Sequence, residues 1–417
     1  MKKNITLLLC LVTAIASAQI FPIGHMSINF KDSTRSGGFA ISGAIQMLGS
    51  GRDIGAEVYY PATSAGTATT PAMGQFPVVV FGHGFVMTYD NYDNIYNDLA
   101  SRGFIVALPR TEGGFSPNHL DFGKDIALLA LQLQSLNTIS LPVALAVFNG
   151  KVLPKSAIGG HSMGGGCSFI GAENNTNLTC LFNMAAATSN TSGVSSIDAA
   201  AMVDVPTLML SGQRDCVADT SVQNSHYANL ASAKKFHIIF SEVTHCDFGN
   251  GSSVTCTIGQ SASGCGNTIS NSLAFFRYMD FLVPFLNNQL KSSCPEGNRF
   301  MDSINATSTV MAGKKIQGTL ICSNISVQNL KPRLDWNIYP NPVKDQLEID
   351  FINRSAYGAV SFYITDQIGH LILAKEYSSF SIGSASEKID MKLFEPGVYY
   401  VTMINVEGKT TQKIVKQ

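Results

Sequence analysis

Charged residues are scarce in this sequence. Asp, Glu, Lys and Arg make up 14% of the 417 residues, and the formal net charge is −1. Without a basic excess the chain does not attract nucleic acid, and without a block of like charge it has no patch suited to a membrane surface. Hydrophobic residues account for 45% of the chain, which is enough for large buried cores in two or three domains.

The sequence also lacks an N-terminal apolar run long enough to cross a bilayer, which requires about 20 residues. The run at residues 5–16 is shorter, follows Lys2 and Lys3, and ends at the small residues 16–18 (ASA). This three-part pattern predicts a secretory signal peptide over residues 1–18, cleaved before Gln19. A buried N-terminal helix is the alternative.

The cysteines form no CxxC pair and show no zinc-ligand spacing, so we expect no structural metal and no cofactor. The chain has nine cysteines, and Cys10 lies inside the signal peptide. The remainder is an even number in an exported chain, which predicts disulfides rather than free thiols. These cysteines are Cys167, Cys180, Cys216, Cys246, Cys256, Cys265, Cys294 and Cys322.

Residues 19–295 alternate strand-like apolar segments with helix-like segments. Such alternation predicts an α/β fold with a mostly parallel sheet covered by helices on both faces. The expected strands are Gly55–Tyr60, Phe76–Phe81, Phe104–Leu108, Ser156–Gly160, Leu181–Ala187, Pro206–Ser211 and Lys235–Ser241, and the expected helices are Tyr92–Ser101, Asp121–Leu136 and Ala274–Leu290.

The pattern changes after this region. Residues 296–333 are polar and rich in Ser, Asn and Thr, which predicts a linker with one strand near Thr319–Cys322. Residues 334–417 contain short alternating runs separated by turn signals, which predicts a small all-β sandwich without helices. Its expected strands include Leu347–Phe351, Val360–Ile364, His370–Ala374 and Val398–Met403.

The pattern G-x-S-x-G occurs at residues 160–164 (GHSMG), between a short strand and a helix-compatible segment. In an α/β-hydrolase fold this turn holds a nucleophilic serine in a strained backbone conformation, and its glycines make room for the turn. The N-terminus of the following helix stabilises negative charge. Ser162 is therefore the expected nucleophile, and a structural glycine turn is the alternative.

An acid and a histidine follow in the order that a triad of this fold requires. Asp215 and His245 come off the ends of two successive predicted strands, at the same sheet edge as Ser162. Asp215 would orient the imidazole, and His245 would take the proton from Ser162 and return it to the leaving group. Asp219 and Asp247 are the alternative acids.

The first central strand leads into the loop FGHGF at residues 81–85, where this fold places an oxyanion-hole donor. We expect the backbone N–H groups of Phe85 and Met163 to bind the developing oxyanion. His119 begins a predicted helix and is interpreted as a cap, with substrate binding as the alternative.

About 18 residues separate the strand ending near Ala187 from Val205, which leaves no room for a large helical lid. An open site suits bulky, polymeric or lipid esters. We expect an apolar acyl cleft around Phe85 and Met163. The other expected substrate-binding residues are Met87, Tyr89, Tyr92 and His161.

Cys216 and Cys246 directly follow the proposed acid and histidine. If those side chains are hydrogen-bonded, their loops lie side by side and the next residues can reach disulfide separation. We therefore predict a Cys216–Cys246 disulfide and, beside it, Cys256–Cys265. The alternative is that each cysteine pairs elsewhere, because connectivity cannot be read from sequence.

Four segments carry a family resemblance: residues 160–166 (GHSMGGG), 205–219 (VPTLMLSGQRDCVAD), 244–246 (THC) and 101–106 (SRGFIV). They resemble bacterial cutinases and polyester hydrolases, including poly(ethylene terephthalate) (PET)-degrading enzymes, and their dienelactone-hydrolase and chlorophyllase relatives. The resemblance implies an α/β-hydrolase fold with the triad and oxyanion residues named above. The sequence departs from the polyesterases at residues 183–188 (NMAAAT), because those enzymes carry there a tryptophan that stacks on aromatic substrate.

The last 84 residues carry a second resemblance. The segments 339–342 (YPNP), 397–401 (GVYYV), Gly408 and the ending 413–415 (KIV) are similar to the type A sorting domain of the type IX (Por) secretion system. This implies contact with the type IX machinery and export to the medium or outer surface of a Gram-negative cell. A carbohydrate-binding sandwich is the alternative.

Together these features predict a secreted, monomeric serine hydrolase that cleaves carboxylic esters, with polyesters such as PET among its candidate substrates. The alternatives are a lipase- or chlorophyllase-like esterase acting on lipids or small esters, a secreted serine peptidase, and a non-catalytic surface adhesin.

Overall fold

The structure is a computed structural model that describes residues 21–138, 142–266, 268–306, 309–322, 336–353, 360–367, 371–377, 383–405 and 408–417. The predicted signal peptide lies outside these residues. The chain divides into two units, the first ending at Cys322 and the second running from Ser323 to Gln417.

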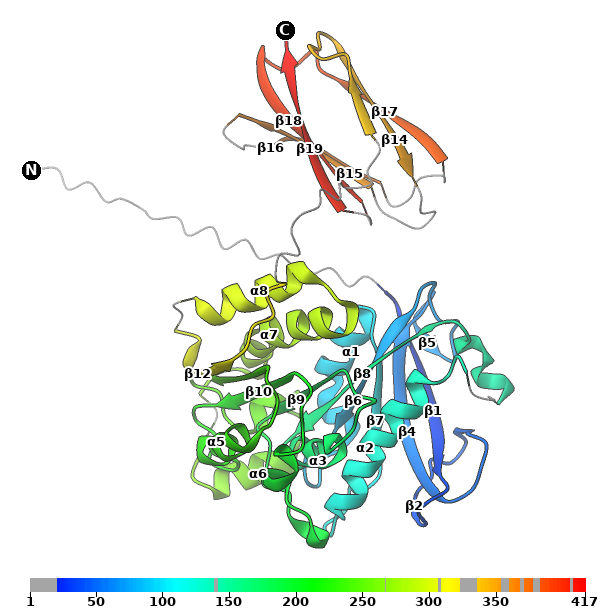
Figure 1. Ribbon diagram of the computed structural model, residues 1–417, viewed down its shortest axis with the longest axis vertical. Helices are drawn as coiled ribbons and strands as arrows, with labels where there is room; N and C mark the ends of the chain where they lie inside the picture. The colour runs from blue at the N-terminus through cyan, green and yellow to red at the C-terminus, as the bar shows by residue number, and fades with distance from the viewer. Residues whose placement is uncertain are drawn as a thin grey trace, which may run out of the picture. The chain divides into compact units, whose positions relative to one another are not determined.

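The first unit is built on a sheet with the strand order β12-β11-β10-β9-β8-β6-β7-β4-β1-β3 (Figure 1). Neighbours from β11 to β7 run parallel, whereas β12, β4 and β1 join the sheet in antiparallel pairs. This arrangement confirms the predicted α/β-hydrolase fold class. The strands are β1 Ile23–Asp32, β2 Gly38–Phe39, β3 Ile45–Gln46, β4 Arg52–Pro61, β5 Gly66–Thr67, β6 Phe76–Gly82, β7 Ile105–Pro109, β8 Val152–His161, β9 Cys180–Met184, β10 Thr207–Gly212, β11 Lys235–Phe240 and β12 Met311–Gln317.

Helices cover both faces of this sheet, and β6 shows why (Figure 1). Successive side chains of a strand point to opposite faces. Val78 and Val80 join the core formed with α2 and α3, whereas Val79 and Phe81 join the core formed with α1 and α7. The helical segments are η1 Tyr89–Tyr92, α1 Asp93–Ser101, α2 His119–Gln134, η2 Val143–Phe148, α3 Met163–Ala172, η3 Thr191–Gly193, α4 Ser196–Ala200, α5 Thr220–Asn229, η4 Cys246–Phe248, α6 Val254–Ala262, α7 Asn271–Lys291 and α8 Cys294–Asn305. Among the described residues, no helix has the length and hydrophobicity to cross a membrane.

Glycines allow α2 and α3 to approach closely. A Cβ atom at Gly123 would lie 2.7 Å from the carbonyl oxygen of Cys167, and one at Gly171 would lie 2.4 Å from the carbonyl oxygen of Gly123. Real Cβ atoms cannot approach so closely, so any larger residue would push the helices apart. Helices α2 and α3, which begin at His119 and Met163, therefore pack closely against one another.

The first unit extends past residue 295, so the predicted linker over 296–333 is wrong as far as Cys322. Helix α8 buries Phe300 and Ile304 in the core that contains α7. Strand β12 pairs with β11, and a disulfide joins Cys294 to Cys322. The large apolar residues of α8 are few (Phe300, Met301 and Ile304) and lie in a polar stretch, so composition alone conceals the helix. Residues 323–335 lie outside the described residues.

The second unit contains two antiparallel sheets with the orders β13-β14-β17 and β16-β15-β18-β19. Leu347, Phe351, Phe362, Val401 and Ile414 belong to one buried cluster. The predicted small all-β domain is confirmed, and its described residues contain no helix; His370 of the predicted third strand is not described. The strands are β13 Trp336–Tyr339, β14 Gln346–Asn353, β15 Val360–Asp366, β16 Leu371–Tyr377, β17 Gly383–Asp390, β18 Gly397–Asn405 and β19 Gly408–Lys416.

Candidate active site

Ser162 occupies the sharp turn between β8 and α3. Its backbone angles are φ 55° and ψ −117°, a region that a residue with a side chain enters only under strain. The turn packs against the end of β6, since Cβ atoms at Gly160 and Gly164 would lie 2.4 and 2.2 Å from the carbonyl oxygen of Gly82. The two glycines of G-x-S-x-G are therefore required by the close approach of backbone to backbone.

A series of hydrogen bonds links Ser162 to His245 and Asp215. The Nε2 atom of His245 lies 2.9 Å from Ser162 Oγ, and its Nδ1 atom lies 2.8 Å from Asp215 Oδ2. The other carboxylate oxygen of Asp215 accepts N–H groups from Val217 and Ala218, each at 2.8 Å. All three side chains are buried. The structure thus brings together the three residues expected from sequence, each following a parallel strand.

The two alternative acids are engaged in other contacts. Asp219 caps α5 by accepting the N–H groups of Ser221 and Val222. Asp247 accepts the N–H and hydroxyl of Thr244 at 2.8 and 2.7 Å, inside the loop that carries His245. Asp219 therefore stabilises a helix end, and Asp247 stabilises the histidine loop.

The loop after β6 contains the peptide unit between Gly84 and Phe85, which carries one of the two expected oxyanion donors. The carbonyl oxygen of Gly84 contacts His83 Nδ1 at 2.9 Å and accepts the N–H of Met87 at 3.1 Å. The carbonyl and N–H of a trans peptide point in opposite directions. The N–H of Phe85, in the same peptide unit, therefore points away from these contacts. Met163 is the first residue of α3, where helix N–H groups have no intrahelical acceptor.

A pocket of about 710 Å³ opens at Ser162. Three of its apolar side chains are solvent-exposed: Phe115 by 84%, Phe85 by 50% and Val217 by 46%. These side chains offer an apolar surface to an acyl group. The lining residues are Phe85, Phe115, Ser116, Pro117, Asn118, His119, Ser162, Met163, Ala187, Thr188, Ser189, Thr191, Ser192 and Val217.

The predicted substrate contacts of Met87, Tyr89, Tyr92 and His161 are not supported, because none of them lines this pocket. Met87, Tyr92 and His161 are buried. Val86 has a positive φ of 51° and lies between the exposed Phe85 and the buried Met87. The ring of Tyr89 instead lies 5.3 Å from the guanidinium of Arg110.

Sequence reasoning missed most of the pocket residues that follow β7 and β9. Phe115 comes from the segment after β7, as does His119, for which substrate binding was the alternative role, and Thr188 comes from the segment after β9. Both strands are parallel neighbours of the strands that carry the elbow and the oxyanion loop. The rule that ligands bind at the carboxyl ends of parallel strands was a usable signal for these segments. His119 lines the pocket, whereas the side chain of Asn118 caps α2.

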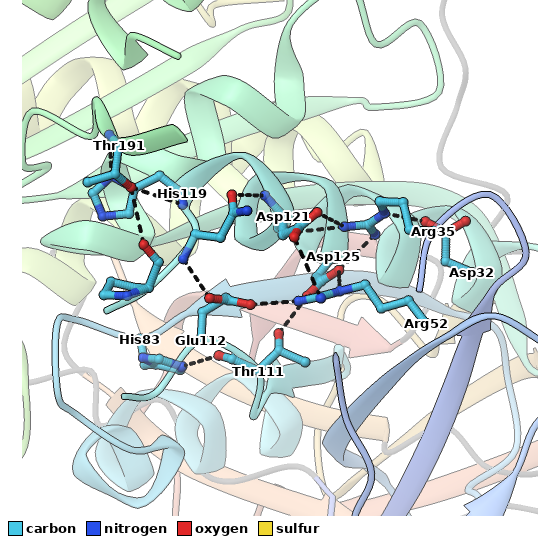
Figure 2. A network of polar contacts seen from close by, with 12 residues as sticks. Asp32, Arg35, Arg52, His83, Thr111, Glu112, His119, Asp121, Asp125 and Thr191 are labelled. Carbon is cyan, nitrogen blue, oxygen red and sulfur yellow. Dashed lines mark hydrogen bonds and ion pairs between the residues drawn. The ribbon is translucent and has the colours of Figure 1, made fainter. Parts of the chain in front are cut away.

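Figure 2 shows a buried polar network beneath the segment after β7. The carboxylate of Asp125 accepts hydrogen bonds from Arg52 at 2.9–3.2 Å and from the Thr111 hydroxyl at 2.7 Å. Glu112 accepts one bond from Arg52 and another from the N–H of Asn118, at 2.7 and 2.6 Å. Arg35 joins the same network through ion pairs with Asp32, Asp121 and Asp125. The network ties residues 111–118, which include Phe115, to β4 and α2.

Figure 2 also shows two histidines beside this network, His83 and His119. The Nε2 atom of His83 lies 3.0 Å from the carbonyl oxygen of Thr111, in addition to its contact with Gly84. Burial lowers the pKa of His83, so its imidazole is neutral. A neutral imidazole donates only one hydrogen bond, so only one of these two carbonyl oxygens accepts from His83. His119 Nδ1 accepts the N–H of Thr191 at 3.3 Å, which joins two pocket segments. Burial lowers the pKa of His119 as well.

The predicted disulfides Cys216–Cys246 and Cys256–Cys265 are wrong. The structure joins Cys216 to Cys265 and Cys246 to Cys256, with Cα separations of 6.1 and 5.9 Å. Although Asp215 and His245 meet, the chain turns into η4 at Cys246, whose N–H is bound by Gln260 of α6 at 2.9 Å. The loop that carries Asp215 and the loop that carries His245 are therefore each joined by a disulfide to the segment containing α6, and not to each other.

Cys167 and Cys180 are free and buried, contrary to the expectation that all the remaining cysteines are paired. They belong to the two core clusters on opposite faces of the sheet, so their sulfur atoms cannot meet. Burial raises the pKa of Cys167 to about 12, which keeps this thiol protonated. Within the described ranges, no group of three or more His, Cys, Asp or Glu side chains could hold a metal ion.

Comparison with known proteins matches both units. Residues 29–271 match a family described as PET hydrolase-like, and residues 337–417 match the secretion system C-terminal sorting domain. Chlorophyllase type 0 of Chenopodium album is 33% identical over 108 residues, which cover 25% of this chain and 31% of that protein. The sorting domain indicates type IX secretion, an extracellular or outer-surface location, and interaction with the secretion machinery.

Proposed function

Because the chain belongs to the PET hydrolase-like family, we propose that it hydrolyses carboxylic esters through an acyl-enzyme formed on Ser162. The observation that carries this proposal is the continuous hydrogen bonding from Ser162 through His245 to Asp215, at 2.9 and 2.8 Å. These distances already suit proton transfer from the serine hydroxyl to the imidazole.

In the first half-reaction, His245 Nε2 takes the hydroxyl proton as Ser162 Oγ attacks the ester carbonyl carbon. The negative charge develops on the carbonyl oxygen, where the N–H groups of Phe85 and Met163 stabilise it. The tetrahedral intermediate expels the alcohol, which receives the proton from His245. Asp215 stabilises the transient imidazolium and holds its Nδ1–H.

In the second half-reaction, a water molecule replaces the alcohol. His245 takes a proton from this water as its oxygen attacks the acyl carbon, and the same N–H groups bind the oxyanion. Collapse breaks the acyl bond to Ser162 Oγ, which recovers its proton from the imidazolium. The free acid leaves and the enzyme returns to its starting state.

The pocket favours an ester with an apolar acyl group. Phe85, Phe115 and Val217 are exposed around Ser162, and burial of apolar surface drives such binding. The segment between β9 and β10 holds only η3 and α4, so a polymer chain or a lipid surface can reach the serine. Polyesters, PET included, are therefore candidate substrates alongside small and lipid esters.

Labelling with a fluorophosphonate probe tests the serine mechanism. The secreted protein is expected to form a stoichiometric covalent adduct, which peptide mapping places on Ser162. A short-chain p-nitrophenyl ester added first should compete with labelling. A folded protein that neither reacts with the probe nor cleaves p-nitrophenyl butyrate would instead support the adhesin alternative.

We predict that Phe115 provides an aromatic contact to the acyl group, in a site whose segment 183–188 contains no tryptophan. Phe115→Ala should lower kcat/KM for p-nitrophenyl benzoate roughly fivefold, since an aromatic pair contributes about 1 kcal/mol. The same variant should change kcat/KM for p-nitrophenyl acetate less than twofold, because the acetyl group lacks a ring.

Phe276→Ala is the matched control for this prediction, since Phe276 is an exposed phenylalanine of α7 outside the pocket. It should leave both esters unaffected. Equal losses on benzoate and acetate in Phe115→Ala would contradict selective recognition of the aromatic acyl group.

A further inference from the structure

Tyr92 and His161 are buried in the structure, yet both carry polar groups. Tyr92 Oη accepts the N–H of Gly84 at 2.9 Å and lies 2.9 Å from His161 Nδ1. His161 Nε2 lies 3.0 Å from the carbonyl oxygen of His245. Three consecutive contacts thus run from the oxyanion loop to the histidine loop.

The chemistry of the end groups sets the direction of every hydrogen bond in this series. The carbonyl oxygen of His245 can only accept, so His161 must donate from Nε2. Burial, together with the neighbouring His245, lowers the pKa of His161 well below its usual value, so the ring is neutral and its Nδ1 is an acceptor. The Tyr92 hydroxyl therefore donates to His161 Nδ1 in preference to the thioether of Met87, a weaker acceptor 3.2 Å away, while its oxygen accepts from Gly84.

Each end of the series lies next to a reacting group. Gly84 precedes Phe85, the proposed oxyanion donor. His161 is bonded through the backbone to Ser162, and its Nε2–H holds the backbone of His245. A Cβ atom at Gly84 would lie 3.1 Å from Tyr92 Oη and 3.3 Å from His161 Nδ1, so the loop packs directly on the pair.

We propose that Tyr92 and His161 form a positioning brace that holds the oxyanion loop, the nucleophile turn and the backbone of His245 in mutual register. This inference rests on the proposed serine mechanism. The brace touches no substrate, so it acts through the placement of Phe85 and His245. Misplacement of catalytic groups by a fraction of an ångström lowers turnover while leaving the pocket intact.

The test is Tyr92→Phe, which keeps the ring and removes the hydroxyl. With p-nitrophenyl butyrate, kcat should fall at least tenfold while KM changes less than twofold. The rate of fluorophosphonate labelling should fall in parallel, because the probe also needs His245 and the oxyanion donors.

Tyr278→Phe is the matched control. Tyr278 is also a buried tyrosine, and its hydroxyl is 3.5 Å from Asn94 and its ring 5.4 Å from Phe248. This variant should keep wild-type kcat, whatever its melting temperature. If Tyr92→Phe lowers only the melting temperature, or lowers kcat no more than Tyr278→Phe, the brace is refuted.

A double-mutant cycle provides a second, independent measurement. His161→Leu removes both ring nitrogens, so it breaks the link to Tyr92 as well as the bond to the carbonyl oxygen of His245. If the two residues act as one unit, Tyr92→Phe/His161→Leu should be no slower than the slower single variant. Multiplicative losses would overturn the proposal. If Tyr92→Phe fails to fold, a fully active His161→Leu would overturn it instead.

The brace and the serine mechanism fail in different ways. A Ser162→Ala variant with wild-type activity would refute the mechanism itself. Inactive Ser162→Ala together with fully active Tyr92→Phe would refute only the brace.

Discussion

Ser162→Ala is expected to reduce kcat for p-nitrophenyl butyrate by about 10⁶-fold, the loss seen when a serine hydrolase is deprived of its nucleophile. Alanine removes the only atom of this residue that can form the acyl-enzyme. The residual rate would come from the oxyanion donors and from substrate binding, which the variant retains. Purified variant and wild type should be compared at saturating substrate, with fluorophosphonate labelling in parallel.

The fold should survive this change. Alanine is smaller than serine, and the strained turn at residue 162 is maintained by the surrounding glycines and by the N–H bond from residue 162 to the carbonyl oxygen of Met184, at 3.0 Å. Ser168→Ala is a suitable control, because Ser168 is a buried serine of α3, the helix that follows Ser162, and its hydroxyl donates to the carbonyl oxygen of Gly165 at 2.7 Å. It should remain active within a few fold. A residual rate in Ser162→Ala comparable to that of Ser168→Ala would contradict the proposed nucleophile.

Asp215→Asn is expected to reduce kcat by about 10⁴-fold, the scale of losing the acid of a triad. The two N–H groups of Val217 and Ala218 will retain the amide oxygen of the asparagine, because they need an acceptor. The amide nitrogen then faces His245 Nδ1 and donates to it. His245 must in turn carry its proton on Nε2, where it can no longer accept the proton of Ser162.

Asp219→Asn provides the matched control, since it makes the same chemical change four residues away. Asparagine caps a helix as well as aspartate does, so α5 should stay intact and kcat should remain within twofold of wild type. Steady-state kinetics of both variants at constant pH decides the assignment. A crippled Asp219→Asn beside an active Asp215→Asn would reverse it.

The sequence alone was sufficient to predict the fold class and to place Ser162, Asp215 and His245 after strands that end at one edge of the sheet. These features depend on local patterns: continuous apolar runs for central strands, helical spacing for the covering helices, and G-x-S-x-G for a turn that admits no Cβ at Gly160 or Gly164. Because parallel strands all end at one edge, Ser162, Asp215 and His245 had to converge once each was assigned to a strand end. The alternation of residues 334–417 likewise identified a separate β domain.

Tertiary structure decided what depends on the direction of loops and side chains. Cys246 follows His245 in sequence, but η4 turns it toward Cys256, so adjacency along the chain did not give the disulfide. Tertiary structure also decided which aromatic residue lies at the pocket. Tyr92 is buried away from it, whereas Phe115 lines it, on a segment held by the hydrogen bond between the Asn118 N–H and Glu112. Such outcomes require the packing of segments distant in sequence, which local propensity does not encode.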